Sequence, residues 1–228
     1  DYNVILCNSD FDSDKEKDYL RVLKEKMVDG VIYMSSSLEE ETLDIINELD
    51  LKTVLVETKD KEGRLPSVYI DNIEATYEAT KHLLDKGIKN IAFIGVDKSS
   101  ANAWGDRYIG YEKALNEAGI TVDEDLVYFE GLKVKSGYVA SEKFLASGKS
   151  FNGIICASDE IAMGAINGLR EKGVNTPEDV SVIGFNDNVV ASYFYPKLTT
   201  VKQPSYDMGS VAMRMLIKIL NNKPLEEA

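Results

Sequence analysis

The sequence predicts an α/β protein with parallel β-sheets, arranged as two lobes. Segments typical of strands alternate with segments typical of helices along the whole chain, as in sheets covered by helices on both faces. The strand-like segments, such as Ile91–Gly95 and Val182–Phe185, are short continuous apolar runs, as expected for buried parallel strands. The alternation is too long for one small sheet, and it restarts after residues 88–90, so we place a break there.

In the first part of the chain, apolar runs bounded by polar turns predict strands at 4–8, 31–34, 53–56 and 68–70. Helical spacing of apolar residues predicts helices at 12–27, 38–49 and 71–86. Leu20, Leu23 and Met27 share one face of the first helix. Ser37 is placed as the N-cap of the second helix, with Glu40 three residues later as in a capping box. Gly87 ends the third helix.

The same reasoning predicts the elements of the second part. Strands are expected at 91–95, 126–129, 153–157, 182–185 and 198–201. Helices are expected at 103–118, 136–146, 159–172 and 205–220. Gly119 and Gly173 follow two of these helices, as helix-ending glycines do. The last helix follows Thr199–Val201 and is free to return to the first lobe.

The formal charge of −13 argues against a DNA-binding surface on this chain, because such a surface needs clustered Lys and Arg. No apolar run approaches the roughly 18 residues that span a bilayer, and no signal-peptide pattern opens the sequence. We therefore expect a protein that does not enter a membrane. Cys7 and Cys156 lie in apolar runs and are expected to be free, buried thiols.

Polar residues follow the predicted strands, where parallel sheets carry their binding sites. They are Asn8 with Ser9, Tyr33 with Ser35, Asp71, Ser158 with Asp159, and Asn186 with Asp187. Carboxylates, amides and hydroxyls in one cleft would suit a polyhydroxylated ligand, and Arg107 would add a planar donor group. Each has a plainer interpretation: Asp71 and Asp159 as helix N-caps, Asn186–Asp187 as a turn, and Arg107 as a solvated charge.

Signatures of catalysis and of cofactor binding are missing. The sequence has no GxGxxG motif, no phosphate-binding loop and no Gly-x-Ser-x-Gly elbow. One His and two distant Cys do not support a zinc site. We therefore predict no metal, no cofactor and no enzymatic activity, although paired strand-end carboxylates leave an acid–base role open.

An ordered set of short motifs resembles one known family. The motifs are residues 28–32 (VDGVI), 71–75 (DNIEA), 82–84 (HLL), 91–95 (IAFIG), 107–111 (RYIGY), 158–164 (SDEIAMG), 182–187 (VIGFND) and 196–201 (PKLTTV). Together they resemble the effector-binding core of the lactose/galactose repressor family of bacterial transcription regulators, nearest its catabolite control protein and ribose-regulator branches. The resemblance covers essentially the whole chain.

The resemblance implies two Rossmann-like lobes joined by three crossovers, as in type I periplasmic binding proteins. The N-terminal lobe would comprise residues 1–89 and 203–221, and the C-terminal lobe residues 90–202. Residues 222–228 would begin a return to the C-terminal lobe. Asn90, Thr199, Thr200 and Val201 are then expected at the crossovers. The family's DNA-binding headpiece and first core strand are absent from this chain, so DNA would be bound only through that missing headpiece.

The resemblance also implies a homodimer and an effector site between the lobes. Motif positions carry the effector-binding role onto Asp71, Arg107, Ser158, Asp159 and Gln203, with Tyr33 at a strand end. Two departures matter: Asn186 stands where relatives have Asp, and Lys133 where relatives often have an aromatic residue. A sugar phosphate would suit Lys133 and Arg107 better than a neutral sugar. A phosphorylated carrier protein ranks below a small effector, because Tyr195 stands where that branch would have Arg.

These expectations give one function and one alternative. The first is the effector-binding and dimerisation core of a cytoplasmic bacterial transcriptional regulator, most simply a repressor, that binds a sugar, a sugar phosphate or a similar small molecule. The alternative is a periplasmic sugar-binding protein of a transport system, because the same fold serves both roles.

Overall fold

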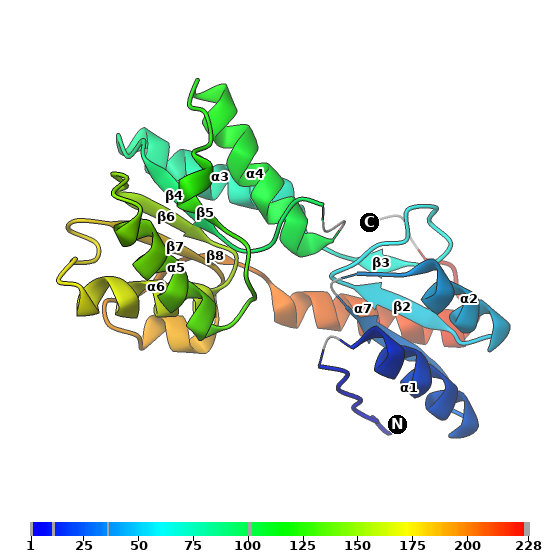
Figure 1. Cartoon of the computed structure of the whole chain (residues 1–228). Helices are drawn as coiled ribbons and strands as arrows, with labels where there is room; N and C mark the ends of the chain where they lie inside the picture. Colours follow the sequence, from blue (N-terminus) through cyan, green and yellow to red (C-terminus); the bar gives the residue numbers. More distant parts are fainter. Residues whose placement is uncertain (1, 11, 36, 100–101, 226–228) are drawn as a thin grey trace. The chain divides into compact units, whose positions relative to one another are not determined.

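A computed structural model describes residues 2–10, 12–35, 37–99 and 102–225. It confirms an α/β protein with parallel sheets, in which β-strands alternate with α-helices (Figure 1). The chain forms two compact units, which we describe separately. Unit 1 comprises Asp1–Tyr69 and Ser205–Ala228, and unit 2 comprises Ile70–Pro204.

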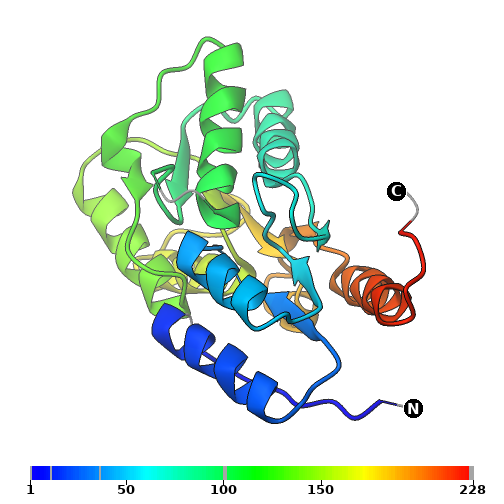
Figure 2. The same cartoon turned by 90° about the vertical axis from the view of Figure 1, so that its right-hand side faces the viewer.

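Unit 1 contains a three-stranded parallel sheet of order β1-β2-β3: β1 (Val31–Met34), β2 (Thr53–Val56) and β3 (Ser67–Val68). Its helices are α1 (Ser13–Glu25), α2 (Glu40–Glu48) and α7 (Ser205–Leu220). Helix α7 packs along the sheet, and α1 and α2 lie side by side (Figure 2). Leu20, Ile46 and Leu55 are buried in a core shared by α1, α2 and the sheet. Removing their apolar side chains from water stabilises this packing.

Unit 2 contains a five-stranded parallel sheet of order β5-β4-β6-β7-β8. Its strands are β4 (Ile91–Ile94), β5 (Val127–Tyr128), β6 (Gly153–Cys156), β7 (Ser181–Asn186) and β8 (Thr199–Lys202). Its α-helices are α3 (Asn72–Asp85), α4 (Ala103–Glu117), α5 (Val134–Ala146) and α6 (Asp159–Glu171), with 3₁₀ turns at Glu124–Leu126 and Val189–Ser192. The α3–α4 pair and the α5–α6 pair cover opposite faces of the sheet (Figure 1). Strands β4 and β6 are therefore buried along their whole length.

The start of the chain differs from the sequence prediction. Residues 4–8 do not form a strand, and among the described residues no strand pairs with the free edge of β1. The side chains of Val4 and Leu6 are 84% and 91% exposed. An apolar run becomes a strand only where a neighbouring strand completes its hydrogen bonds, so here the run alone predicted too much.

The capping box at Ser37 is also wrong. Helix α2 begins at Glu40, its N-cap is Glu39, and no side chain caps it. The N–H of Ser37 instead lies 3.4 Å from the hydroxyl of Ser35. Local hydrogen bonding of this kind competes with helix initiation, which explains the later start.

The chain divides before α3, whereas the sequence suggested a break after it. Helix α3 packs closely on α4: a Cβ atom on Gly110 of α4 would come within 2.2 Å of the Ile73 carbonyl oxygen. Residues 70–89 therefore belong to unit 2, and Asn90 lies inside that unit. The Asn90 carbonyl accepts hydrogen bonds from the N–H groups of Asn152 and Gly153, so Asn90 is not a crossover.

The second division falls between Pro204 and Ser205, two residues after β8. Thr199, Thr200 and Val201, expected at a crossover, lie within β8 and pair with β7. Residues 222–225 follow α7 and belong to unit 1, and the remainder of the predicted return, residues 226–228, lies outside the described residues.

Asp12 caps α1 by accepting hydrogen bonds from the N–H groups of Asp14 and Lys15.

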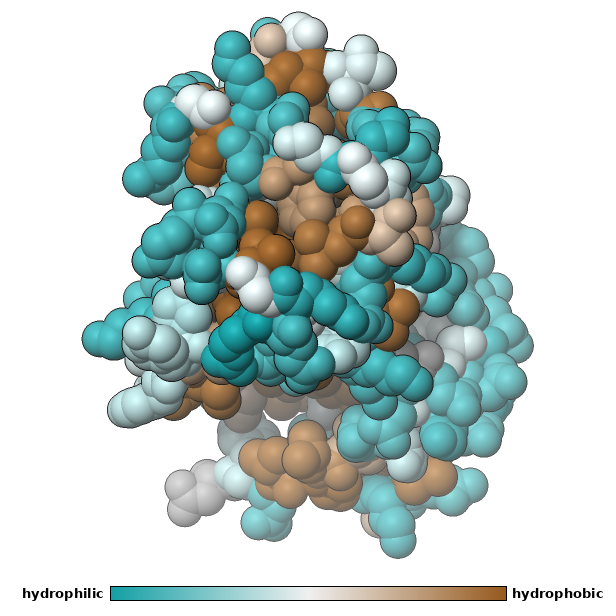
Figure 3. Space-filling view, turned by 60° about the vertical axis from the view of Figure 1, so that its left-hand side comes forward, coloured by the Kyte–Doolittle hydropathy of each residue, from teal (hydrophilic) through white to brown (hydrophobic). Residues whose placement is uncertain are grey.

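The surface agrees with the acidic composition. On the face shown in Figure 3, hydrophilic side chains cover most of the surface and apolar side chains form separate areas between them. Among the described residues, no helix combines the length and apolar character needed to cross a membrane. The same residues contain no cluster of three or more His, Cys, Asp or Glu arranged to hold a metal ion.

Candidate functional site

Arg107 lies buried at the carboxyl edge of the sheet in unit 2, with 3% of its surface exposed. It projects from the second turn of α4, whose start is fixed by Asn102: the Asn102 side chain accepts hydrogen bonds from the N–H groups of Trp104 and Gly105. The sequence prediction of a planar donor group near this edge therefore agrees with where Arg107 lies, and the interpretation as a solvated charge is wrong.

Oxygen atoms from several segments contact the guanidinium of Arg107. Nε donates to Oδ1 of Asn72 at 2.9 Å, and Nη1 donates to the carbonyl oxygen of Ala157 at 2.5 Å. Longer contacts join Nη1 to Oδ1 of Asn186 at 3.4 Å and Nη2 to Oε1 of Gln203 at 3.5 Å. The parallel strand order explains the set, because β6, β7 and β8 end beside one another at this edge.

Two aromatic rings face the same guanidinium. Its central carbon lies 3.6 Å from the ring centroid of Phe185 and 4.5 Å from that of Trp104. The negative face of an aromatic ring attracts a cation, so both rings stabilise the buried charge. Trp104 is half-buried and packs against this arginine.

The turn after β7 has an unusual backbone. Asn186 has φ 109° and Asp187 has φ 58°, both in the region of positive φ that residues other than Gly rarely adopt. The N–H of Asp187 donates to the hydroxyl of Thr200, and the N–H of Gln203 donates to the carbonyl of Asn186. These bonds keep the turn in place and direct the Asn186 amide towards Arg107.

Asp159 is fully buried at the start of α6. Its carboxylate accepts hydrogen bonds from the N–H of Asn188 at 2.7 Å and from the Thr200 hydroxyl at 2.5 Å. Burial raises the pKa of Asp159, while the bonds from Thr200 and Asn188 oppose that shift. The neighbouring Ser158 is the N-cap of α6 and accepts a hydrogen bond from the N–H of Ile161. Both side chains are therefore used in holding this edge together.

Asp71 and Lys133 lie apart from the Arg107 cluster. Asp71 is exposed and caps α3 by accepting a hydrogen bond from the N–H of Glu74 at 2.9 Å. Lys133 is exposed at the N-cap position of α5 and makes no capping bond with its side chain. Within unit 2, the structure thus groups Arg107 with Asn186 and Gln203, and it records no contact of that group with Asp71 or Lys133.

Tyr33 belongs to unit 1 and has its own set of contacts. Its hydroxyl donates to Oε2 of Glu16 at 2.5 Å, and the hydroxyls of Ser9 and Ser35 donate to Oε1 of the same carboxylate. Burial and the bond to Glu16 raise the pKa of Tyr33 above its ordinary value. Ser9, Tyr33 and Ser35, which the sequence analysis placed as polar groups of a ligand cleft, thus all donate to Glu16, and their predicted role in binding stays a prediction.

Sequence reasoning missed two members of the Arg107 cluster, Asn72 and Phe185. Asn72 follows the predicted Asp71, and only helix geometry decides which of two adjacent residues points inward. Phe185 was placed in β7 as a core residue, and the pattern of apolar residues carries no information on what it contacts. The carbonyl of Ala157 has no sequence signal at all.

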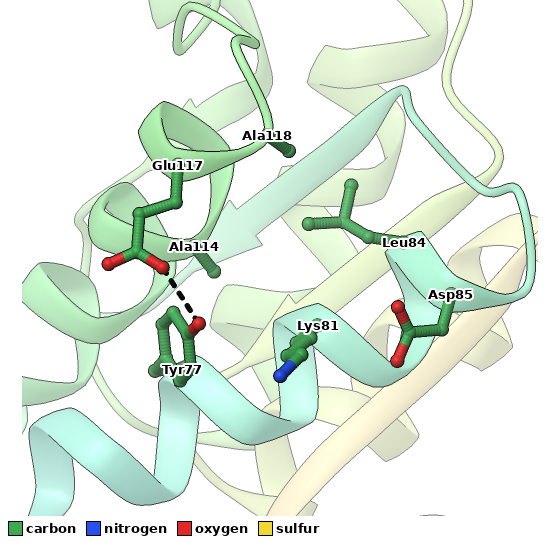
Figure 4. A pocket seen from close by; sticks show the side chains of 7 residues that line it. All are labelled: Tyr77, Lys81, Leu84, Asp85, Ala114, Glu117 and Ala118. Atoms are coloured by element: carbon green, nitrogen blue, oxygen red, sulfur yellow. Dashed lines mark hydrogen bonds between the residues drawn. The ribbon is translucent and has the colours of Figure 1, made fainter.

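Unit 2 also has a hollow, which lies away from Arg107. It has a volume of about 230 Å³ and is formed by the carboxyl-terminal halves of α3 and α4 (Figure 4). Tyr77 donates a hydrogen bond to Glu117 across it at 2.7 Å, and Lys81, Leu84 and Asp85 complete one side. Arg107 lies near the amino-terminal ends of these helices, so this hollow is separate from the cluster described above.

Comparison with known proteins identifies the relatives. Residues 80–228 match the periplasmic binding protein-like domain family. The chain is 68% identical to the HTH-type transcriptional regulator RegA of Clostridium saccharobutylicum, over 100% of this chain and 68% of the relative. The chain spans about two thirds of the length of this relative and of the regulator of the same name from Clostridium acetobutylicum, 68% and 66%.

Solved structures agree. The transcription regulator CcpA of Lactococcus lactis is similar with a TM-score of 0.89 and 38% identity, covering 99% of this chain and 82% of that one. A sugar-binding transcriptional regulator of the LacI family from Escherichia coli, complexed with phosphate, is similar with a TM-score of 0.83 and 29% identity, covering 93% and 77%. The predicted resemblance is confirmed: the chain belongs to the LacI family of transcriptional regulators and corresponds to its effector-binding domain.

Proposed function

We propose that this chain is the effector-binding and dimerisation core of a bacterial repressor, and that the Arg107 cluster takes part in binding a small effector. The effector class that we propose is a sugar, a sugar phosphate or a similar polar molecule. DNA would be bound through a headpiece outside this chain, because a chain with a formal charge of −13 does not offer the clustered cations that DNA needs.

The observation that carries the proposal is the placement of Arg107. A guanidinium buried at the carboxyl edge of a parallel sheet, held by amide oxygens and aromatic faces, has a fixed orientation. Its planar donors match the oxygens of vicinal hydroxyls or of a phosphate. Open α/β sheets bind ligands at this edge, which supports the location.

Two features favour a phosphorylated sugar over a neutral one. Lys133, which makes no recorded contact with the Arg107 cluster, is exposed at the amino-terminal end of α5 and would be a separate cation for an anionic group. Asn186 supplies an uncharged amide beside Arg107, so this position adds no repulsion towards an anionic group. The structure of the sugar-binding regulator from Escherichia coli is complexed with phosphate, which is compatible with an anionic group in the ligand.

The effector would act by shifting a conformational equilibrium. A ligand changes the balance between two states only by as much as its affinity for them differs. The proposal therefore requires that the effector stabilise one state of the core over the other and that the attached headpiece respond. The matched relatives are transcription regulators, which does not favour the periplasmic transport role or an enzymatic one. A phosphorylated carrier protein remains a lower-ranked partner because of Tyr195.

A homodimer is supported by one exposed apolar surface of unit 2. Residues 188–196 contain no charged side chain, and Val189, Val190, Tyr193 and Tyr195 are 78%, 59%, 84% and 83% exposed. Exposed apolar surfaces of this kind mark interaction sites. On a strongly acidic chain, an uncharged surface is where a second copy can approach with the least repulsion.

A thermal-shift panel tests the proposed effector class. The protein is mixed with sugars, sugar phosphates and nucleobases, and a true effector raises the melting temperature because it binds the folded state. The expected result is a rise with a member of the sugar or sugar phosphate group that is reduced in Arg107→Lys. A hit that stabilises the parent and Arg107→Lys equally would place the effector elsewhere.

A further inference from the structure

Arg107 contacts residues beside both points at which the chain passes between the two units. Asn72 lies two residues after the unit starts at Ile70, and Gln203 lies one residue before it ends at Pro204. Asn72 and Gln203 are 6% and 7% exposed, so both contacts are shielded from water. We call residues 70–72 and 203–204 the connecting segments. The guanidinium of Arg107 therefore contacts both connecting segments, and all of these residues belong to unit 2.

Asn72 uses both ends of its amide group. Its Oδ1 accepts the hydrogen bond from Nε of Arg107 at 2.9 Å, and its Nδ2 donates to the carbonyl oxygen of Ile70 at 3.3 Å. An amide combines a donor and an acceptor, whereas an ionised carboxylate accepts only and an alkyl group does neither. Asn is thus suited to joining Arg107 to the Ile70 backbone, and Asp keeps only half of that link.

The distances separate firm contacts from weak ones. Arg107 lies 2.9 Å from Asn72, an ordinary hydrogen-bond distance, and 2.5 Å from the carbonyl of Ala157, which is shorter than usual. Its contacts with Asn186 and Gln203, at 3.4 and 3.5 Å, are near the limit for a hydrogen bond. An oxygen of a bound ligand would therefore compete with Gln203 and Asn186 for the Nη donors, while Asn72 continues to hold Nε.

We propose that Asn72 is a positioning residue of the effector site: it fixes the Arg107 guanidinium and ties it to the connecting segment at Ile70, while Gln203 is the contact that the effector displaces at the other connecting segment. This inference rests on the proposed function of Arg107. It adds that a ligand bound to Arg107 would break the contact with Gln203, at one connecting segment. The contact with Asn72, at the other connecting segment, would remain.

A ligand-free NMR experiment tests the positioning role. Two signals are followed, the Arg107 Nε–H and the carbonyl carbon of Ile70. In Asn72→Ala, the Nε–H should exchange with water at least about tenfold faster, since a hydrogen bond to a charged group is lost, and the Ile70 carbonyl should shift. In Asn72→Asp, which keeps the acceptor and loses the donor, only the Ile70 carbonyl should shift.

Asn102→Ala is the matched control. It removes the cap of α4, the helix that carries Arg107, without removing a group that contacts the guanidinium. If both signals stay as in the parent, loss of stability alone does not explain the Asn72 variants. The inference is overturned if Asn72→Ala leaves the Nε–H signal unchanged, or if Asn72→Asp loses protection as Asn72→Ala does, or if Asn102→Ala gives the same changes.

The ligand arm uses a compound that stabilises the parent in the thermal-shift panel, with inorganic phosphate as a fixed probe beside it. The Gln203 side-chain amide signal should move on titration while that of Asn72 does not, and Asn72→Ala should bind at least about tenfold more weakly. Equal affinity in Asn72→Ala and the parent overturns this inference and leaves the proposed function standing. If no panel compound binds but the NMR pattern appears, the proposed function fails and the positioning role of Asn72 stands.

Discussion

The hydroxyl of Thr200 donates a hydrogen bond of 2.5 Å to the buried carboxylate of Asp159, joining edge strand β8 to the start of α6. The second oxygen of Asp159 accepts from the N–H of Asn188 at 2.7 Å. Among the strands of the described residues, β8 pairs only with β7, so this side-chain bond adds a second restraint on the strand that leads to Gln203.

Asp159→Asn is expected to destabilise the protein by about 1–3 kcal/mol, because the amide keeps one acceptor oxygen where the carboxylate has two. Urea-induced unfolding followed by circular dichroism measures the change. Asp125→Asn, at an exposed site, serves as the control and should change stability little. An unchanged midpoint in Asp159→Asn would mean that the two hydrogen bonds contribute nothing net.

The difference in stability between the parent and Asp159→Asn should depend on pH, in a direction that the pKa shift of Asp159 predicts. Burial raises the pKa of Asp159 in the folded state above its unfolded value of about 3.9. The folded state then binds more protons across that window, so stability falls as pH rises through it. The advantage of the parent over Asp159→Asn should therefore shrink as the pH rises above the unfolded pKa of about 3.9. An advantage that grows as the pH rises would contradict the assignment.

Asp60 and Arg64 in unit 1 predict the opposite sign. Both nitrogens Nε and Nη2 of Arg64 bond to the Asp60 carboxylate at 2.9 Å, and the N–H groups of Glu62 and Arg64 donate to it as well. The Arg64 bond is the main cause that lowers the pKa of Asp60 well below its ordinary value.

For a lowered folded pKa, the stabilisation is present above the unfolded pKa of about 3.9 and is lost as pH falls below it. Asp60→Asn should therefore lose stability at neutral pH and approach the parent in acid, measured by urea unfolding at a series of pH values. Asp18→Asn is the control, because its carboxylate is 76% exposed in an ion pair with Arg21. A loss that is independent of pH would contradict the linkage.

The α5–α6 contact predicts a strong effect of one methyl group. A Cβ atom on Gly164 would come within 1.9 Å of the Val134 carbonyl oxygen, which belongs to the backbone and cannot move aside. Gly164→Ala should destabilise the protein by about 3 kcal/mol or more. Gly209→Ala in α7, where no atom lies within 4 Å of the added Cβ, should stabilise it by about 0.5–1 kcal/mol. Similar melting temperatures for the two variants would refute the close packing of α5 on α6.

Much of this fold was predictable because buried parallel strands leave continuous apolar runs, as at Ile91–Ile94 and Gly153–Cys156. The motif at residues 107–111 predicted an effector-binding role for Arg107. Its grouping with Asn186 and Gln203 follows from the strand order. The error at residues 4–8 arose because an apolar run does not state whether a partner strand is present. The position of Asn90 was misjudged because the packing of α3 on α4 depends on Gly110, a contact that periodicity does not encode.

The uncharged surface at residues 188–196 predicts the oligomeric state. Tyr193→Asp with Tyr195→Asp would place two carboxylates on that surface, and dimerisation should weaken at least tenfold, equivalent to about 1.4 kcal/mol. Sedimentation velocity over a range of concentrations measures the change. Tyr206→Asp is the control, because Tyr206 is 86% exposed and lies on α7. A parent that stays monomeric throughout, or a double variant that dimerises like Tyr206→Asp, would remove this surface from the account.

The central claim is that Arg107 binds the effector, and isothermal titration calorimetry with the best panel compound tests it most directly. Asp71→Asn supplies a matched comparison, because Asn also caps a helix and the variant removes only the charge. The account predicts that Arg107→Lys binds at least about tenfold more weakly than the parent, since a lysine cannot reproduce the planar fork of donors. The variant should still be folded and should unfold in a single transition. Equal affinity in the parent and in a folded Arg107→Lys would contradict it.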